Sequence, residues 1–436
     1  ASGLVYTGAD GTFYQTTQTP SVSIDRLFTV DTTGGAAFAA IDSSGTYGNN
    51  VLTAGAANNA TLVFNNTGAI VISGTTNTAT VVLQGTSTGD NTFSPQLAGT
   101  NVALIKDDVG LWVLGGTNNT YSGATTINKG ILRAQDANSA ATSATVYAPA
   151  TATTDLWVGS SYGLVVGQTV SGTGVANGST IAAILDPTHI RLSSSNTVAA
   201  GTGLTFGSIN SLSSNSNLVF NQSTAGTEAI LEMAGTFTRA VGTAAGQVQW
   251  ATNASGGFAA SSSPLTVNLG GAATPSQVSF GSGAGFIGNG TGQLYLNSTT
   301  ALSDVTFVNP ISLNGGSRTI TVFDNATTTT DFATLAGVIS GGAGSALTKS
   351  GSGTLYITGA NTYSGNTTLS AGVVIVTSIG GGSTPASAFG DGSGTLTLSG
   401  STPLVYVGDG ETSARRITYT VSTALDASGS GPLVLT

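Results

Sequence analysis

The chain has 436 residues, of which 63 are Gly and only 7% are charged, against about a quarter in an average soluble domain. It carries 10 Lys and Arg, 19 Asp and Glu, one His and no Cys, for a formal net charge of −9. So few basic residues exclude a phosphate-binding surface, and we expect no nucleic-acid partner. No window approaches 18 consecutive apolar residues, so no membrane-spanning helix is predicted, and the absence of Cys excludes disulfides and thiolate metal sites.

The predicted elements are strands throughout. Short runs of Val, Ile, Leu, Phe, Tyr and Thr recur between clusters of Gly, Asn, Asp and Ser. Such runs are typical of strands joined by turns, and no stretch has the 3.6-residue period of a helix. Since 39% of the residues are apolar, the chain can build a core, which argues against disorder. An all-β fold is therefore predicted.

The two ends of the chain resemble each other. The chain begins Ala1-Ser2-Gly3 with no basic, apolar leader, as expected of an exported chain whose signal has been removed. Three phrases return in the same order: LVYTGADG (4–11), DRLFTV (25–30) and AIDSSG (40–45) reappear as LVYVGDGE (404–411), ARRITYTV (414–421) and ALDASG (424–429). We expect a solenoid that ends in the phase in which it began, with each coil stacked on the last.

A clearer repeat lies between these ends. Residues 104–134 read LIKDDVGLWVLGGTNNTYSGATTINKGILRA, and residues 347–376 read LTKSGSGTLYITGANTYSGNTTLSAGVVIV. Lys106 aligns with Lys349 and Gly110 with Gly353, and Asn119 is taken as an extra residue of the first copy. The assigned motif residues are Gly116, Asn118, Thr120, Tyr121, Ser122, Gly123, Thr125, Thr126 and Gly130, and Gly359, Asn361, Thr362, Tyr363, Ser364, Gly365, Thr367, Thr368 and Gly372.

Each repeat unit predicts strands of a parallel β-helix. LWVLGG and TLYITG each give a short strand whose side chains alternate inward and outward. Gly and Asn form the corners because both tolerate positive φ. At about 4.8 Å per coil and on the order of 20–25 residues per coil, the whole chain makes a rod about 80–100 Å long.

The pattern G-x-L-x-L-x-G-x-N-T-Y-S-G-x-T-T-I/L-x-x-G resembles the autotransporter-associated β-strand repeat, also called the passenger-associated transport repeat. Segments 236–260, 265–271 and 320–341 resemble sequences found between such repeats in large secreted proteins. The resemblance implies a right-handed parallel β-helix, or β-solenoid, in an extracellular or bacterial cell-surface location.

One segment, 137–207, breaks the pattern with shorter phrases such as VSGTGV and HIRLSSS. Asp186-Pro187-Thr188 is a good turn between two of its strands. We expect a small inserted β-sandwich-like domain on the side of the rod. The predicted organisation is a first solenoid part at 1–136, the insert at 137–207 and a second solenoid part at 208–436.

Pairs of acidic residues are candidates for carbohydrate cleavage, because a glycosidase on this scaffold needs two carboxylates on neighbouring coils. Asp107 and Asp108 form the densest cluster, but the aligned repeat has Ser350 and Gly351 there, which favours a solvated turn.

The other acidic groups are also expected to be structural. Glu228 and Glu232 are predicted to share one exposed face of a strand. Asp409 and Glu411, near Arg415 and Arg416, are predicted to form a surface turn with an ion pair.

The remaining candidates are aromatic residues and the lone His189. Trp112 aligns with Leu355, which predicts a packing role, whereas Trp157 or Trp250 could be an exposed glycan contact. His189 has no recognisable catalytic partner in the sequence. No cofactor is predicted. A structural Ca²⁺ held by backbone carbonyls and one Asp stays open, although no repeated calcium motif occurs.

These features predict a non-enzymatic extracellular structural protein: a stiff rod for surface display, adhesion or matrix building. Both ends read as uncapped strands, so the chain either belongs to a longer array or stacks end to end on copies of itself. Two alternatives stay open: a glycan-binding adhesin that uses the insert, and a polysaccharide-degrading β-helix enzyme. A phage fibre or spike is a weaker interpretation.

Overall fold

The computed structural model describes a stack of short strands. The described residues are 4–6, 22–25, 27, 29–31, 50–54, 61–73, 78–116, 119–134, 142–161, 164, 168–207, 211–224, 226–281, 283, 285–288, 290–381, 386–400, 403–420 and 422–436. Over these ranges every regular element is a strand, and no helix long and apolar enough to cross a membrane is found. The all-β prediction is confirmed.

Two ladders of parallel strands form the N-terminal half. The first is β1 (Leu4–Tyr6), β4 (Asn50–Ala54), β7 (Ala79–Gly85), β9 (Val102–Lys106), β11 (Thr125–Ile127), β19 (Leu218–Phe220) and β21 (Val248–Trp250). The second is β2 (Val22–Ile24), β5 (Leu62–Phe64), β8 (Asn91–Phe93), β10 (Leu111–Leu114), β12 (Gly130–Ala134), β20 (Ala229–Phe237) and β22 (Gly256–Val267).

Strand β22 is long enough to turn a corner and start two ladders. Residues 256–258 pair with β24 (Leu294–Leu296). The ladder continues through β27 (Ser317–Val322), β30 (Ala346–Ser350), β32 (Thr367–Leu369), β34 (Leu396–Leu398) and β37 (Ile417–Tyr419). Residues 265–267 lead to β25 (Val305–Phe307), β28 (Ala333–Leu335), β31 (Leu355–Ile357), β33 (Val374–Val376), β35 (Leu404–Tyr406) and β38 (Leu425–Ala427).

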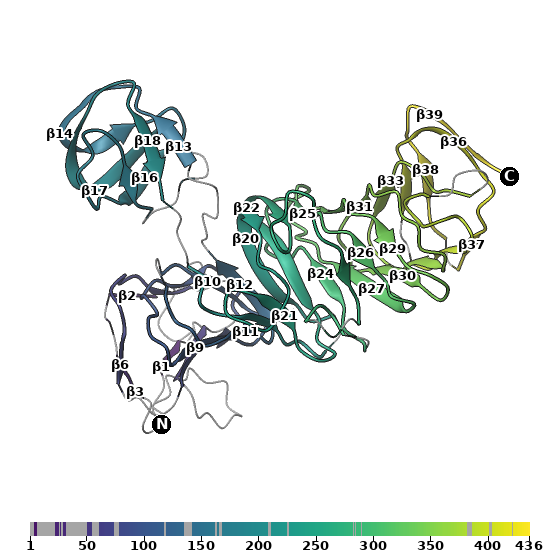
Figure 1. Ribbon diagram of the computed structural model, residues 1–436, viewed down its shortest axis with the longest axis horizontal. Helices are drawn as coiled ribbons and strands as arrows, with labels where there is room; N and C mark the ends of the chain where they lie inside the picture. The colour runs from purple at the N-terminus through teal and green to yellow at the C-terminus, as the bar shows by residue number, and fades with distance from the viewer. Residues whose placement is uncertain are drawn as a thin grey trace, which may run out of the picture.

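A third face carries shorter pairings: β3 (Thr29–Asp31) with β6 (Val71–Ser73); β23 (Val278–Ser279), β26 (Ile311–Ser312) and β29 (Ile339–Ser340); and β36 (Asp409–Ser413) with β39 (Gly431–Leu435). The chain thus visits three faces in turn and then begins the next coil. Leu347 pairs with Thr367, 20 residues on, and Thr367 pairs with Leu396, 29 residues on. This is the predicted parallel β-helix, with corner loops that make some coils longer than expected (Figure 1).

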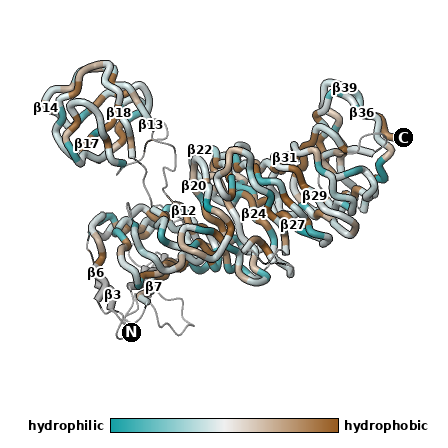
Figure 2. The backbone as a smooth tube through the Cα atoms, viewed as in Figure 1, coloured by the Kyte–Doolittle hydropathy of each residue, from teal (hydrophilic) through white to brown (hydrophobic). Residues whose placement is uncertain are grey.

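The core runs along the stack without interruption. One cluster of buried apolar side chains extends from Leu62 to Leu404. In β31, Leu355 and Ile357 are buried while Tyr356 between them is only half-buried, and neighbouring strands repeat this alternation. Hydrophobic segments recur along the stacked coils (Figure 2). Because the coils stack in register, Leu355 lies on Val374 and Val374 on Leu404. Each such side chain contributes roughly 1.5–3 kcal/mol on burial, so the stacked interior holds the rod together.

Strands β13–β18 lie beside the stack as a separate lobe (Figure 1). They are β13 (Thr142–Thr145), β14 (Ala150–Trp157), β15 (Val170–Ser171), β16 (Ile181–Asp186), β17 (His189–Val198) and β18 (Gly203–Phe206). They form two three-stranded antiparallel sheets, β13-β18-β15 and β14-β17-β16, around a hydrophobic cluster of their own. The exact domain limits at 137 and 207 stay a prediction, and residue 137 lies outside the described residues.

The predicted phase match of the two ends is wrong. Strand β1 stacks in the ladder of β9 and β11, the first ladder of the repeat unit. Strand β35, with the same Leu-Val-Tyr sequence, stacks on β33, which belongs to the other ladder of the second repeat. An apolar-x-apolar tripeptide fits any inward-facing strand, so its identity does not fix the face it occupies. Residues 40–45 lie outside the described residues.

Candidate functional site

A buried Asn holds the same corner of both repeats. Oδ1 of Asn361 accepts the Ile339 N–H at 2.6 Å, from the preceding coil, and its Nδ2 donates to Ala388 O at 2.7 Å. In the first repeat these roles belong to Asn119, whose Oδ1 accepts the Leu97 N–H at 2.7 Å. The residue equivalent to Asn361 is thus Asn119, and the extra residue falls at Asn118, which lies outside the described residues.

A Tyr–Thr pair follows each corner. The hydroxyls of Tyr121 and Thr125 are 2.7 Å apart, and those of Tyr363 and Thr367 are 2.6 Å apart. Both Tyr side chains are fully buried, so the hydrogen bond satisfies a hydroxyl that would otherwise be costly inside the core. The polar motif residues that are exposed or half-buried are Thr120, Ser122, Thr126, Thr362, Ser364 and Thr368.

The motif glycines mark where one coil passes close to the next. A Cβ at Gly123 would lie 2.3 Å from Val102 O, and one at Gly365 would lie 1.7 Å from Ser345 O. A Cβ at Gly116 or at Gly359 would likewise lie 2.7 Å from a backbone oxygen of the neighbouring coil. Any side chain there would push the coils apart, which explains why the pattern requires Gly.

A buried Lys closes the next turn. Nζ of Lys349 donates to the carbonyls of Gly351, Gly353 and Ala371, each at 2.6 Å. Nζ of Lys106 does the same to three carbonyls in the first repeat, including those of Asp107 and Asp108. A Cβ at the turn glycine would meet the amine: Gly372, with φ of +72°, would place it 2.3 Å from Lys349 Nζ. Burial lowers the pKa of each lysine to about 7.

Asp107 and Asp108 are therefore part of this turn, as predicted. Asp108 has a φ of +56°, and its N–H donates to Oδ1 of Asp107 at 2.9 Å. Their carbonyls, rather than their carboxylates, face the lysine. The alignment of Lys106 with Lys349 was visible in the sequence, but a lysine beside a Gly- or Asp-rich turn normally indicates a solvated side chain.

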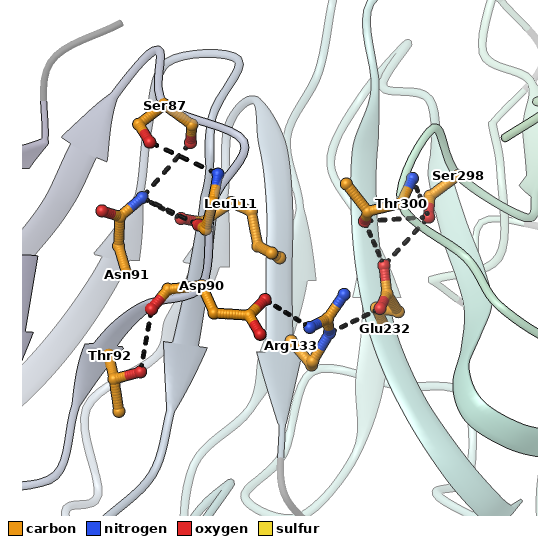
Figure 3. Close-up of polar contacts among 10 residues, drawn as sticks. Ser87, Asp90, Asn91, Thr92, Leu111, Arg133, Glu232, Ser298 and Thr300 are labelled. Carbon is orange, nitrogen blue, oxygen red and sulfur yellow. Dashed lines mark hydrogen bonds and ion pairs between the residues drawn. The ribbon is translucent and has the colours of Figure 1, made fainter. Parts of the chain in front are cut away.

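A polar network runs along the second ladder, from the residue before β8 to the segment that follows β24 (Figure 3). Arg133 on β12 donates from Nε to Oε1 of Glu232 on β20 at 2.6 Å, and from Nη1 to Oδ1 of Asp90 at 2.7 Å. Oε2 of Glu232 also accepts hydrogen bonds from the hydroxyls of Ser298, at 2.9 Å, and Thr300, at 2.6 Å. Glu232 is fully buried, so its charge is stabilised by these three partners.

The predicted exposure is wrong for Glu232, which is fully buried, whereas Glu228 is half-buried. The segment 298–300 covers this face, and Thr299 donates its N–H and its hydroxyl to Glu228 at 2.7 and 2.9 Å. Burial raises the pKa of Glu228. The covering segment lies about 70 residues further along the chain, so no local pattern reveals it.

The predicted ion pair near Glu411 is also wrong. Glu411 accepts the N–H groups of Ile379 and Gly380 at 2.9 and 2.8 Å. Arg415 is buried and donates to the carbonyls of Ile379 and Gly394. Both side chains serve backbone groups of neighbouring coils instead of each other.

Side-chain hydrogen bonds also connect the segment that precedes the lobe in the sequence to the segment that follows it. Strand β12 ends before the lobe and β19 follows it, yet Ser213 Oγ donates to Tyr121 O at 2.6 Å. The hydroxyls of Thr125 and Ser216 are 2.8 Å apart. Strand β12 then pairs directly with β20. The coil therefore closes behind the lobe as though the intervening residues were a loop.

The Arg133 network gives a matched pair of substitutions. We expect Arg133→Ala to lower the free energy of unfolding by about 3 kcal/mol, because it leaves the Glu232 carboxylate buried without its counter-charge. Asp90 has a side chain that is 68% exposed, so Asp90→Ala is expected to cost about 1 kcal/mol or less. Urea denaturation of both variants measures the difference. Equal losses in the two variants would contradict this account of Glu232.

The aromatic candidates separate into two groups. Trp112 is fully buried with its Nε1–H donated to Gln84 O at 2.9 Å, which confirms its packing role. Trp250 is also in the core and donates to Gly256 O, so the interpretation of Trp250 as an exposed contact is wrong. Trp157 is half-buried on the lobe, where its ring stacks on His189 at 4.3 Å between centroids.

The structure brings Trp157 and His189 together with charged neighbours. Arg191 donates from Nε and Nη2 to both carboxylate oxygens of Asp155, at 2.7 and 3.1 Å. His189 lies 3.8 Å from a carboxylate oxygen of Asp155 and 3.8 Å from one of Asp186. Across the described ranges, no group of three His, Asp or Glu side chains is arranged as metal ligands would be.

A comparison with protein families matches both repeats described above. A family model described as the passenger-associated-transport-repeat matches residues 104–134, 347–376 and 391–407. The third match was missed by sequence reasoning, because GSGTLTLSG keeps the strand of the motif without the Asn-Thr-Tyr-Ser-Gly corner.

Two proteins are similar over part of the chain. The adhesin BmaC autotransporter of Brucella suis biovar 1 (strain 1330) is 44% identical over 75 residues, which are 16% of this chain and 2% of that protein. The Gp54 tailspike of the Acinetobacter baumannii bacteriophage AP22, solved in complex with a capsular saccharide, aligns over 81% of this chain and 71% of its own. It is 9% identical, with a TM-score of 0.16, too low to bear on the fold.

The buried Asn, the Tyr–Thr pair and the lysine-closed turn are the structural form of the matched motif. Together with the autotransporter match, they indicate a secreted or cell-surface protein. The chain is a parallel β-helix that carries passenger-associated transport repeats.

Proposed function

We propose that the protein is a non-enzymatic rod that displays its lateral lobe at the bacterial surface for adhesion. The observation that carries this proposal is the continuous hydrophobic cluster that runs along the stack from Leu62 to Leu404. A continuous stacked interior gives a stiff object whose length grows with the number of coils. The similarity to an autotransporter adhesin supports the adhesive role.

Several charged side chains are engaged by other groups of the protein itself, which supports a non-enzymatic role. Lys106, Lys349 and Arg415 donate to backbone carbonyls, and Glu232 is enclosed by Arg133 and two hydroxyls. A hydrolase instead needs a pair of carboxylates that a sugar can reach. Asp107 and Asp108 sit on a turn whose carbonyls hold a lysine, so their positions are set by packing between coils.

Stacking of copies end to end is a finer part of this proposal. In the last described coil, Tyr419, Val434 and Leu435 are 45–48% exposed, and a further coil would cover such side chains. Only 7% of the residues are charged, so electrostatic repulsion between two copies opposes such stacking only weakly.

Electron microscopy of the purified chain and an adhesion assay test the proposal together. The longest ladder, from β2 to β38, stacks 13 strands, so we expect rods about 60 Å long with a lateral knob, and beads coated with the protein should adhere to host-cell or biofilm surfaces. Threads that lengthen with concentration would support end-to-end stacking, and single rods at every concentration would remove that part. Release of reducing sugars from polysaccharides, abolished by Asp107→Asn with Asp108→Asn, would contradict the non-enzymatic role.

A further inference from the structure

A row of three aromatic side chains crosses one face of the lobe. Trp157 on β14 pairs directly with His189 on β17. On the other side of β14, Val146 bridges Val158 and the Tyr147 N–H donates to Trp157 O at 3.1 Å, so Tyr147 lies opposite Trp157. Residues directly opposite in antiparallel strands project from the same face.

This face looks away from the core of the lobe. Leu156 and Ile190, the neighbours of Trp157 and His189 on their strands, are fully buried. Tyr147 is 58% exposed, the highest value among the large apolar and aromatic side chains that stand out as exposed in the described ranges. The indole of Trp157 has one face against His189, with 11° between the planes.

Charged groups frame the row. The Arg191 hydrogen bonds lower the pKa of Asp155, and the Thr188 backbone N–H lowers the pKa of Asp186, so both carboxylates are ionised at neutral pH. Arg191 contacts Asp155 through Nε and Nη2. In the described part of the chain, Nε2 of His189 has no hydrogen-bond partner, and the 3.8 Å gaps to the two carboxylates are too long for direct hydrogen bonds.

From this geometry we infer that the face bearing Tyr147, Trp157 and His189 binds a neutral saccharide chain. The C–H face of a sugar ring packs on an aromatic ring, while its hydroxyls both donate and accept hydrogen bonds. The carboxylates of Asp155 and Asp186 can accept from such hydroxyls, and the half-exposed guanidinium of Arg191 offers complementary N–H groups, whereas Nε2 of His189 is buried and contributes through its ring alone.

The charge balance favours a neutral ligand over an anionic one. Two carboxylates and one guanidinium leave the face without a positive excess, and the chain as a whole carries −9. A phosphorylated or acidic polysaccharide would be repelled. A protein partner would use the aromatic row as well, and the test below separates the two.

This inference rests on the proposed display function, since it names what the displayed lobe holds. The purified 436-residue chain is tested by biolayer interferometry against immobilised mannan, galactan, dextran and β-1,3-glucan. Alginate serves as the anionic probe and gelatin as the protein probe. We expect binding to at least one neutral polysaccharide and none to alginate or gelatin.

Trp157→Ala and Tyr147→Ala are each expected to weaken that binding about tenfold or more, and Trp157→Phe to retain most of it. Tyr419→Ala is the matched control, because Tyr419 is an aromatic residue 48% exposed on the last coil, outside the lobe. The control should bind as the parent does. Because Tyr147 is largely exposed, its substitution leaves the fold of the lobe intact even if that of Trp157 disturbs it.

Failure of this inference is distinguishable from failure of the display function. Binding to none of the neutral polysaccharides would overturn the inference, as would binding only to alginate or gelatin. Equal loss in Tyr419→Ala would also overturn it. In each case electron microscopy of the same samples shows whether the rod itself is present.

Discussion

Gly365→Ala is expected to lower the free energy of unfolding by about 3 kcal/mol or more. Its Cβ would lie 1.7 Å from Ser345 O and 2.5 Å from the carbonyl carbon of the same residue. Both atoms belong to the backbone of the preceding coil, which cannot rotate away as a flexible side chain can. The two coils must separate locally, and the hydrogen bonds between β30 and β32 are strained.

Gly342→Ala is the matched control for this prediction. Nothing lies within 4 Å of a Cβ at Gly342, and its φ is outside the left-handed region. There alanine should stabilise the protein by about 0.5 kcal/mol, because it reduces the freedom of the unfolded chain. Urea denaturation gives the overall change, and amide hydrogen exchange of residues 345–369 shows whether the loss is local. If both variants have the same stability, the close stacking described for Gly365 is wrong.

The two buried lysines predict a stability that increases with pH. Burial lowers the pKa of Lys106 and of Lys349 from 10.5 to about 7. Between these values the unfolded chain binds a proton on each lysine and the folded chain does not, so the free energy of unfolding rises with pH. The loss of stability caused by burying the two lysines is therefore at its full value below about pH 7 and decreases to zero toward about pH 10.5. We expect a gain on the order of a few kcal/mol between pH 7 and pH 9.

Substitution separates the lysines from other titrating groups. Lys106→Met with Lys349→Met should abolish the increase between pH 7 and pH 9. At pH 9 the double variant should still be less stable than the parent by about 1–2 kcal/mol, because each neutral amine donates two hydrogen bonds to its turn carbonyls that methionine cannot replace. Chemical denaturation at a series of pH values measures both effects. An unchanged pH profile in the double variant would show that these amines do not carry the dependence.

Much of the fold could be predicted because β-solenoid signals are local. The Gly corners, the alternation in TLYITG and the Asn-Thr-Tyr-Ser-Gly motif each act within one coil, and the coil repeats. The prediction went wrong where a contact joins distant segments. Nothing near Glu232 in the sequence announces Thr300, and nothing near Asn119 announces the carbonyl of Ser211.

The lobe illustrates the same limit. Its strand-rich sequence predicts a small β domain, and Trp157 and His189 are candidates there only as separate residues. Their proximity depends on the register between β14 and β17, which includes shifts between Ala150 and Asp155. Tyr147 was missed because it follows β13 in a short connection, where an exposed aromatic residue has no periodic signal.

The central claim is that successive coils lie flat on one another, and spin-label distances test it most directly. The chain has no Cys, so single labels can be placed on the outward positions Thr266, Ile375, Val405 and Asp426, which belong to one ladder. Pulsed electron–electron double resonance is measured from position 266 to each of the other three. The stack predicts narrow distributions that lengthen by about 5 Å per coil in the order 375, 405, 426. Distances that do not follow this order, or that are equal within error, would contradict it.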